Sequence, residues 1–143
     1  NGQHTNFRES SLGRAYWEAD KFACWTEKNE GMESILTTTT LTVGGNYIEV
    51  LADEADAEKD WKLMASVHPV WTENAYEGLG MEDAVTEKSG RWIRISWKGK
   101  KLPDKSGCIR FQFKNLKIWA VRGELEYKGH RLWEGADMEN EGM

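Results

Sequence analysis

The pattern of apolar and polar residues is clearest between residues 89 and 122, where three runs rich in β-branched and aromatic residues are separated by turn residues. These runs cover residues 92–97, 109–114 and 116–121, with a corner at Asn115 between the last two. In the middle run Ile109, Phe111 and Phe113 alternate with polar residues, which is the period of a strand with one buried face. Strands of this kind must bury their apolar faces against a second layer.

Similar patterns predict four more strands upstream. They cover residues 14–22, 35–43, 47–51 and 61–67. Gly44-Gly45 predicts a hairpin turn between two of them, and Pro69 is expected to end or bend the last. Residues 52–60 are acidic and predict a solvated loop, whereas residues 68–85 have no regular pattern. The expected fold is therefore all-β, a two-layer antiparallel β-sandwich of jelly-roll-like form.

Length and composition indicate a single globular domain. The chain has 143 residues, of which 30% are charged and 39% hydrophobic, and it contains 14 glycines but only two prolines. We expect a polar lead-in at residues 1–11, the sandwich module at 12–127 and a charged tail or linker at 128–143. The sequence starts at Asn1 and is interpreted as a piece of a longer protein, so a missing targeting segment carries no information on compartment.

Charge and spacing argue against several classes of function. A net charge of −5 disfavours nucleic acid as a partner, and no run of 18 apolar residues predicts a membrane span. The three histidines lack metal-ligand spacing, and the acidic residues 53–60 lack the glycine and terminal glutamate of an EF-hand calcium loop. No phosphate-binding loop or nucleophile elbow is present, so neither a cofactor nor a catalytic residue is predicted.

The two cysteines lie far apart in the sequence. Cys24 and Cys108 have no C-x-x-C spacing, which argues against a metal or redox site. They could form one bridge or remain two buried thiols, and the buried thiols are the preferred interpretation.

Eight tryptophans are the most unusual feature of the composition. Those in phase with apolar neighbours on strands, and therefore expected in the core, are Trp17, Trp61 and Trp97. Those at strand ends or in polar loops are Trp25, Trp71 and Trp133. The pattern does not assign Trp92 to the core or to the surface. Trp119 is out of phase with Ile118 but in phase with Val121.

Exposed tryptophans beside polar side chains predict sugar binding. A pyranose offers a flat C–H face and hydroxyls at its edge, so its binder needs an aromatic ring and nearby carboxylate, amide or guanidinium groups. Residues 70–77 supply both kinds within one loop, and Trp25 is followed by similar polar residues. The predicted ligand-binding residues are Trp71, Tyr76, Glu73, Asn74, Trp25 and Trp119. The alternative is that these rings only cap the ends of the sandwich.

Residues 91–122, RWIRISWKGKKLPDKSGCIRFQFKNLKIWAVR, carry a resemblance to a known group. They resemble the end of the β-sandwich module found beside five-bladed propeller glycosidases and in related bacterial proteins. That module closes with a strand ending in Trp-Lys-Gly, an Arg-Phe-x-Phe/Leu strand, an Asn or Asp corner and a final strand. The matching positions are 97–99, 110–113, 115 and 116–121. Residues 12–22 and 36–50 are similar to earlier parts of the module, and all of these motifs are structural.

The resemblance implies two functions. The first is a non-catalytic carbohydrate-binding module of a secreted or extracytoplasmic polysaccharide-degrading enzyme, which holds its neighbouring catalytic domain on a polysaccharide or oligosaccharide through avidity. The second is a structural sandwich that buttresses a glycosidase propeller and has no ligand of its own. The additional Trp-bearing segment near the C-terminus favours the first.

Overall fold

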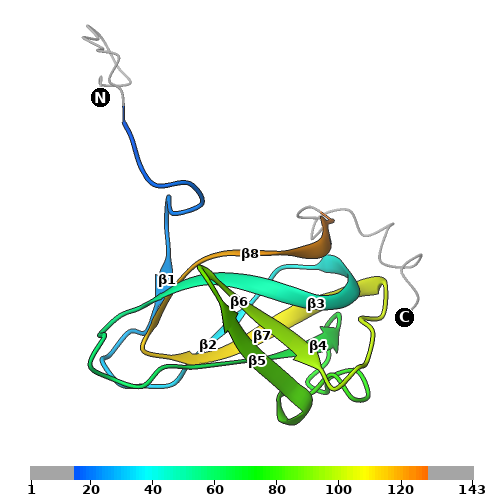
Figure 1. The fold of residues 1–143 in the computed structure, drawn as a ribbon. Coiled ribbons are helices and arrows are strands. Elements are labelled where there is room, and N and C mark those ends of the chain that lie inside the picture. Colours follow the sequence, from blue (N-terminus) through cyan, green and yellow to red (C-terminus); the bar gives the residue numbers. More distant parts are fainter. Residues whose placement is uncertain (1–14, 129–143) are drawn as a thin grey trace, which may run out of the picture.

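The computed structural model describes residues 15–128, whose strands are all antiparallel (Figure 1). The strands are β1 (Trp25–Thr26), β2 (Ser34–Thr37), β3 (Leu41–Glu54), β4 (Lys62–Pro69), β5 (Ala84–Ser89), β6 (Trp92–Trp97), β7 (Lys105–Lys114) and β8 (Leu116–Tyr127). A single 3-10 turn, η1 (Met81–Asp83), is the one helical element of the described residues. The prediction of an all-β antiparallel fold is confirmed.

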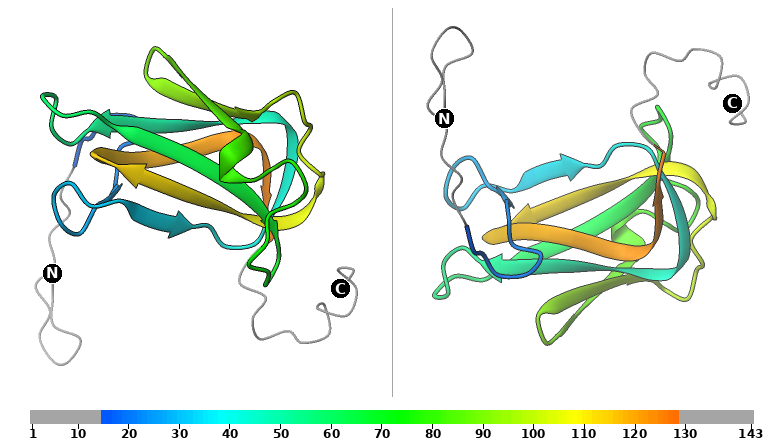
Figure 2. Two further views of the ribbon diagram at one scale, coloured as in Figure 1. Left: turned by 90° about the horizontal axis from the view of Figure 1, so that it is seen from below. Right: turned by 90° about the horizontal axis from the view of Figure 1, so that it is seen from above.

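Two rows of strands enclose the core, and Figure 2 shows them from opposite sides of the molecule. One row has the order β1-β8-β3-β6-β5, and in the other β7 lies between β2 and β4. The rows are joined at one end, because Leu41 at the start of β3 pairs with Gly107 of β7. Hydrogen bonding therefore runs through all eight strands as one continuous sheet, which folds over its own apolar face.

The core contains the inward residues of both rows. Phe111 and Phe113 of β7 are buried there, as the alternation predicts. Trp97 is 0% exposed, and its indole N–H donates to the carbonyl of Ala65 at 3.1 Å, which ties β6 to β4 across the core. Trp61 packs against the margin of the core. The core prediction is therefore confirmed for Trp97, whereas Trp61 is only partly buried.

The prediction of an N-terminal strand at residues 14–22 is wrong for the residues of that range that the structure describes. Residues 15–24 form an extended and turning segment, and pairing starts only in the two residues of β1. Lys21 anchors this segment to Asp53 of β3 with an ion pair of 2.8 Å. Trp17 is 57% exposed and contacts Phe22 with a ring separation of 5.0 Å, so its predicted place in the core is also wrong. The alternation there arises from small alanines that provide little surface to bury.

The prediction of a hairpin turn at Gly44-Gly45 is also wrong. β3 continues through both glycines, and its pairing with β8 shifts register between Gly44 and Ile48. Gly45 has a φ of 84°, which an L side chain rarely adopts. The glycines thus bend one long strand, which allows its first part to pair with β7 and its second part with β6.

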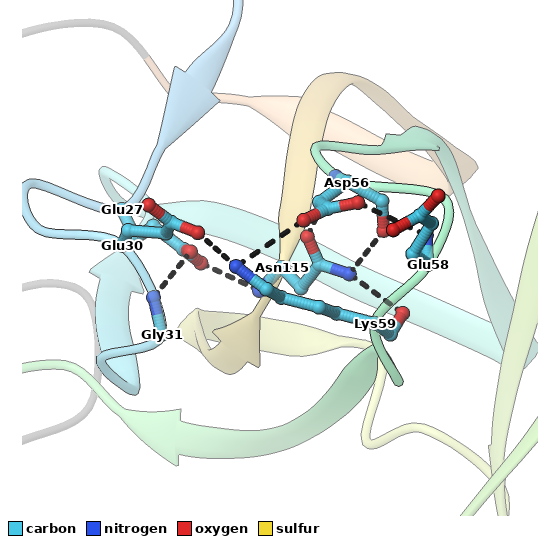
Figure 3. A network of polar contacts seen from close by, with 7 residues as sticks. All are labelled: Glu27, Glu30, Gly31, Asp56, Glu58, Lys59 and Asn115. Carbon is cyan, nitrogen blue, oxygen red and sulfur yellow. Dashed lines mark hydrogen bonds and ion pairs between the residues drawn. The ribbon is translucent and has the colours of Figure 1, made fainter.

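The corner at Asn115 has the predicted position and a larger role than predicted (Figure 3). Asn115 is buried at 3% exposure, and its backbone has a left-handed φ of 54°. The amide group donates to the carbonyls of Asp56 and Lys59 at 2.8 Å each, and the amide oxygen accepts from the N–H of Asp56 at 2.8 Å. The Asn115 N–H also donates to Glu27. One buried side chain therefore anchors the acidic loop 55–60.

The two cysteines do not pair with each other. Cys24 and Cys108 are both free thiols, with Cys24 exposed and Cys108 half-buried, so a bridge does not form and Cys24 departs from the buried-thiol interpretation. Burial raises the pKa of the Cys108 thiol. Trp133 and the predicted tail lie outside the described residues. Within residues 15–128 no helix has the length and apolar character needed to cross a bilayer.

Candidate functional site

The loop of residues 70–77, which follows β4, carries four of the six predicted ligand-binding residues (Figure 1). It returns to the sheet at Tyr76, whose N–H donates to the carbonyl of Val67 at 2.8 Å. The Tyr76 hydroxyl donates to the carbonyl of Ser106 in β7 at 3.1 Å. The Val67 N–H donates to Leu79 beyond the loop at 3.0 Å. The loop is thus fastened to both β4 and β7.

Trp71, at the start of this loop, combines an exposed side chain with an unusual backbone conformation. Its side chain is 69% exposed, and its φ of 63° lies in the left-handed region. That conformation costs an L residue roughly 1–2 kcal/mol, and for a bulky side chain it is a genuine outlier. Thr72 stabilises the turn, because its hydroxyl donates to Pro69 at 3.2 Å or to Asn74 at 3.0 Å. The chain therefore maintains local strain while keeping a large indole in solvent, a combination that occurs at functional sites.

The other three predicted residues of the loop divide into two kinds. Glu73 and Asn74 are exposed and offer a carboxylate and an amide near Trp71 in sequence. Tyr76 is half-buried, its hydroxyl is used by Ser106, and burial raises the pKa of its phenol. Tyr76 therefore fixes the loop in place, while Glu73 and Asn74 remain open to a ligand.

The structure places Trp25 and Trp119 away from this loop, on the row that contains β1, β8 and β3. Trp25 is exposed and pairs with Ile118 of β8. Trp119 is half-buried, and its indole donates to Asp53 at 2.9 Å. Pairing of β3 with β8 is irregular at this point, since Leu51 faces Ala120 and Ala52 faces Ile118. Trp119 is the extra residue of this irregularity, which explains why the alternation of β8 changes phase at this position. The six predicted residues thus form two separate groups.

A ladder of charged and aromatic residues covers the same row, formed by Tyr47, Glu49, Trp92, Arg94 and Arg122. The guanidinium of Arg94 lies 4.0 Å from the ring centre of Tyr47, and that of Arg122 lies 3.9 Å from the ring centre of Trp92. Both donate to Glu49, at 3.1 and 2.8 Å. The hydrogen bond from Arg122, followed by that from Arg94, holds the pKa of Glu49 below its usual range. Glu49 thus pairs with both arginines, and these contacts link β3, β6 and β8 on their outer surface.

A different surface lies beside the Trp71 loop, on the outer side of the row β2-β7-β4. Pairing shows which side chains share it: Lys62, Met64, Ser66 and His68 of β4, Cys108, Arg110, Gln112 and Lys114 of β7, and Ile35 and Thr37 of β2. Ser66 and His68 are buried although they point away from the core. We call these ten residues the outer face. The sequence predicts a polar side for β7, but it does not show which strands lie beside it.

His68 is the most enclosed polar group of the outer face. It is 4% exposed, and its Nε2 lies 2.7 Å from the hydroxyl of Ser66. Its Nδ1 has no hydrogen-bond partner within residues 15–128, although the backbone of Asn74 and Glu73 is close enough to favour the protonated ring. Burial, followed by the charge of Arg110, lowers the pKa of His68. The imidazole of His68 therefore packs beneath the loop in its uncharged form.

The buried imidazole predicts a loss of stability at mildly acidic pH. Because the folded-state pKa of His68 lies below the unfolded value of about 6.5, its contribution is complete above that pH. It is lost as the pH falls toward the folded-state pKa, since the unfolded chain then binds more protons. We expect the urea midpoint to decrease from pH 7.5 to pH 5.0.

A His68→Gln variant is the control for this expectation, and its urea midpoint should change less between the two pH values. The groups that face His68 from the neighbouring elements are Arg110, Cys108 and Glu73. Burial raises the pKa of the Cys108 thiol, away from this range. The ion-paired carboxylates Glu33 and Asp56 have lowered pKa values and act at more acidic pH. An equally steep decrease in the variant would contradict the role of His68.

Neither the chemistry of the outer face nor the comparisons identify an enzyme. The Ser66–His68 pair is enclosed beneath the loop and out of reach of a substrate. No cluster of three potential metal ligands occurs in the part of the chain that the structure describes. Comparison with family models, with curated proteins and with solved structures gives no significant match. The resemblance to the propeller-associated sandwich therefore stays a prediction from the residues.

Proposed function

We propose that the chain is a non-catalytic carbohydrate-binding module, with the Trp71 loop as its binding site. The observation that carries the proposal is the strained and exposed indole of Trp71, on a loop fastened at Tyr76 to two strands. A ring held in this way can stack on the C–H face of a pyranose with little loss of conformational entropy. Glu73 and Asn74 supply hydrogen-bonding groups for the hydroxyls.

Such a module acts by avidity in a polysaccharide-degrading enzyme. Weak binding by the module raises the local concentration of a linked catalytic domain on the polymer, without any chemistry by the module itself. We therefore propose a polysaccharide or oligosaccharide as ligand, a catalytic domain of the same chain as partner and a location outside the cytoplasm.

Affinity electrophoresis of the 143-residue chain tests this proposal. Native gels containing soluble glucans, xylans, mannans, galactans or pectins should slow the chain in at least one polymer, relative to a reference protein without sugar affinity. The same gels loaded with a Trp71→Ala variant should show no retardation. Equal migration of the unchanged chain in every polymer, with normal folding, would contradict the proposal.

A second candidate function is supported by exposed aromatics near the N-terminal end of the described residues. Tyr16, Trp17, Phe22 and Trp25 are all exposed. A surface of this kind suits contact with a neighbouring domain, as a buttress for a glycosidase propeller would require. The buttress predicts no response to any polysaccharide and a marked protection of these rings in the longer protein. Tryptophan fluorescence quenching by iodide, with and without the neighbouring domain, distinguishes the two.

A further inference from the structure

Arg110 differs from the other arginines that the structure describes. Arg91 pairs with Glu18, and both Arg94 and Arg122 pair with Glu49. Arg110 is half-buried on β7, and its guanidinium makes no ion pair or hydrogen bond to another residue between 15 and 128. The guanidinium therefore has no carboxylate partner among these residues, and an external carboxylate or sulfate can pair with it through charge-assisted hydrogen bonds.

The position of Arg110 connects it to the Trp71 loop. It pairs with Ser66 of β4, which contacts the imidazole of His68, and the loop backbone lies beside that ring. The loop leaves the sheet after Pro69, which pairs with Gly107, three residues before Arg110 on β7. At about 3.3 Å per residue, Arg110 lies roughly 10 Å along the strand from this exit. A short oligosaccharide can span that distance.

The surrounding charge also suits an anion. The outer face carries Lys62, Arg110 and Lys114, and Glu33 at its edge is engaged by Lys62 at 2.6 Å and by Gln112. These strands are therefore locally cationic in a chain whose net charge is −5. Arg110 is the member of this group whose planar guanidinium can hold a carboxylate through two parallel hydrogen bonds.

We propose that Arg110 makes the binding site selective for acidic glycans, with the guanidinium binding the anionic group of a sugar whose neighbouring ring stacks on Trp71. The anionic group is the carboxylate of a uronic acid or a sulfate ester, since a guanidinium pairs with either. This inference rests on the proposed function of the Trp71 loop and adds the class of its ligand.

Isothermal titration of the 143-residue chain with three polymers tests the inference. The polymers are polygalacturonate, its fully methyl-esterified form and a sulfated galactan. Arg110→Gln should lower the affinity for the preferred acidic polymer about tenfold, and Arg110→Lys should retain part of it. The esterified polymer should bind the unchanged chain more weakly and should not respond to Arg110→Gln. Whichever acidic polymer depends on Arg110 identifies the anionic group.

A matched control separates this effect from net charge. Lys117→Gln makes the same change of charge on β8, where Lys117 is exposed and belongs to the other row. It should alter the affinity less than twofold, and thermal unfolding should confirm that all variants fold. Undiminished acidic-polymer binding by Arg110→Gln, or an equal loss in Lys117→Gln, would overturn the inference. If Trp71→Ala abolishes binding while Arg110→Gln does not, only the ligand class is wrong. If Trp71→Ala binds normally, the proposed function itself fails.

Discussion

Replacing Trp71 with alanine is expected to lower the affinity for a bound glycan about 30-fold, which corresponds to roughly 2 kcal/mol. An indole that stacks on a sugar removes part of its apolar surface from water, and about 80 Å² at 25 cal/mol per Å² accounts for that figure. The 69% exposure of Trp71 in the free chain means that this surface is available to a ligand. Titration calorimetry with the polymer that retards the chain measures the change.

Stability provides the control for the Trp71 variant. The side chain makes no contribution to the core, so Trp71→Ala should leave the free energy of unfolding within about 1 kcal/mol of the original. Trp71→Gly should be at least as stable as Trp71→Ala, because glycine accepts the φ of 63° without steric cost. Both variants should lose binding. A glycan affinity unchanged by both substitutions would mean that the indole of Trp71 does not bind the glycan.

Replacing Asn115 with alanine is expected to lower the free energy of unfolding by about 4 kcal/mol. The substitution removes three hydrogen bonds, to the backbone of Asp56 and Lys59, and leaves partly buried backbone groups unpaired. Each such loss costs roughly 1 kcal/mol or more. Alanine also lacks the tolerance of asparagine for the φ of 54°, which adds about 1 kcal/mol. Urea unfolding followed by tryptophan fluorescence measures the total.

Asn115→Gly separates these two causes. Glycine accepts the left-handed backbone but removes the same three hydrogen bonds, so the expected loss is about 3 kcal/mol. The acidic loop should then become more accessible to proteases that cleave after Lys59. A glycine variant as stable as the original chain would show that the side-chain hydrogen bonds in Figure 3 contribute nothing to folding.

Local patterns predict much of this fold because several strands have one buried face. The alternation around Phe111 and the corner at Asn115 both have the positions expected from the sequence. Two failures have a common cause. The N-terminal segment alternates without becoming a strand, and Gly44-Gly45 bends β3 instead of ending it. Both outcomes depend on pairing with β8 or contact with β3, which local periodicity does not encode.

The candidate site is predictable to a similar degree. The polar context of Trp71 indicates an exposed ring, and the structure confirms that exposure. The separation of Trp119 from the loop follows from an irregular pairing of β3 with β8, which no spacing rule shows. Arg110 and His68 are 42 positions apart in the sequence, and they become neighbours because β4 pairs with β7. The register of that pairing is what places a cation beside the loop.

Nuclear magnetic resonance of the tryptophan indoles tests the central claim most directly. The indole N–H of Trp71 is assigned from a Trp71→Phe variant, and that of the buried Trp97 serves as the internal reference. During titration with a retarding oligosaccharide, we expect the Trp71 resonance to shift with saturation while the Trp97 resonance stays in place. A saturable change in other resonances with Trp71 unmoved, or no change in any resonance across the panel, would contradict the account.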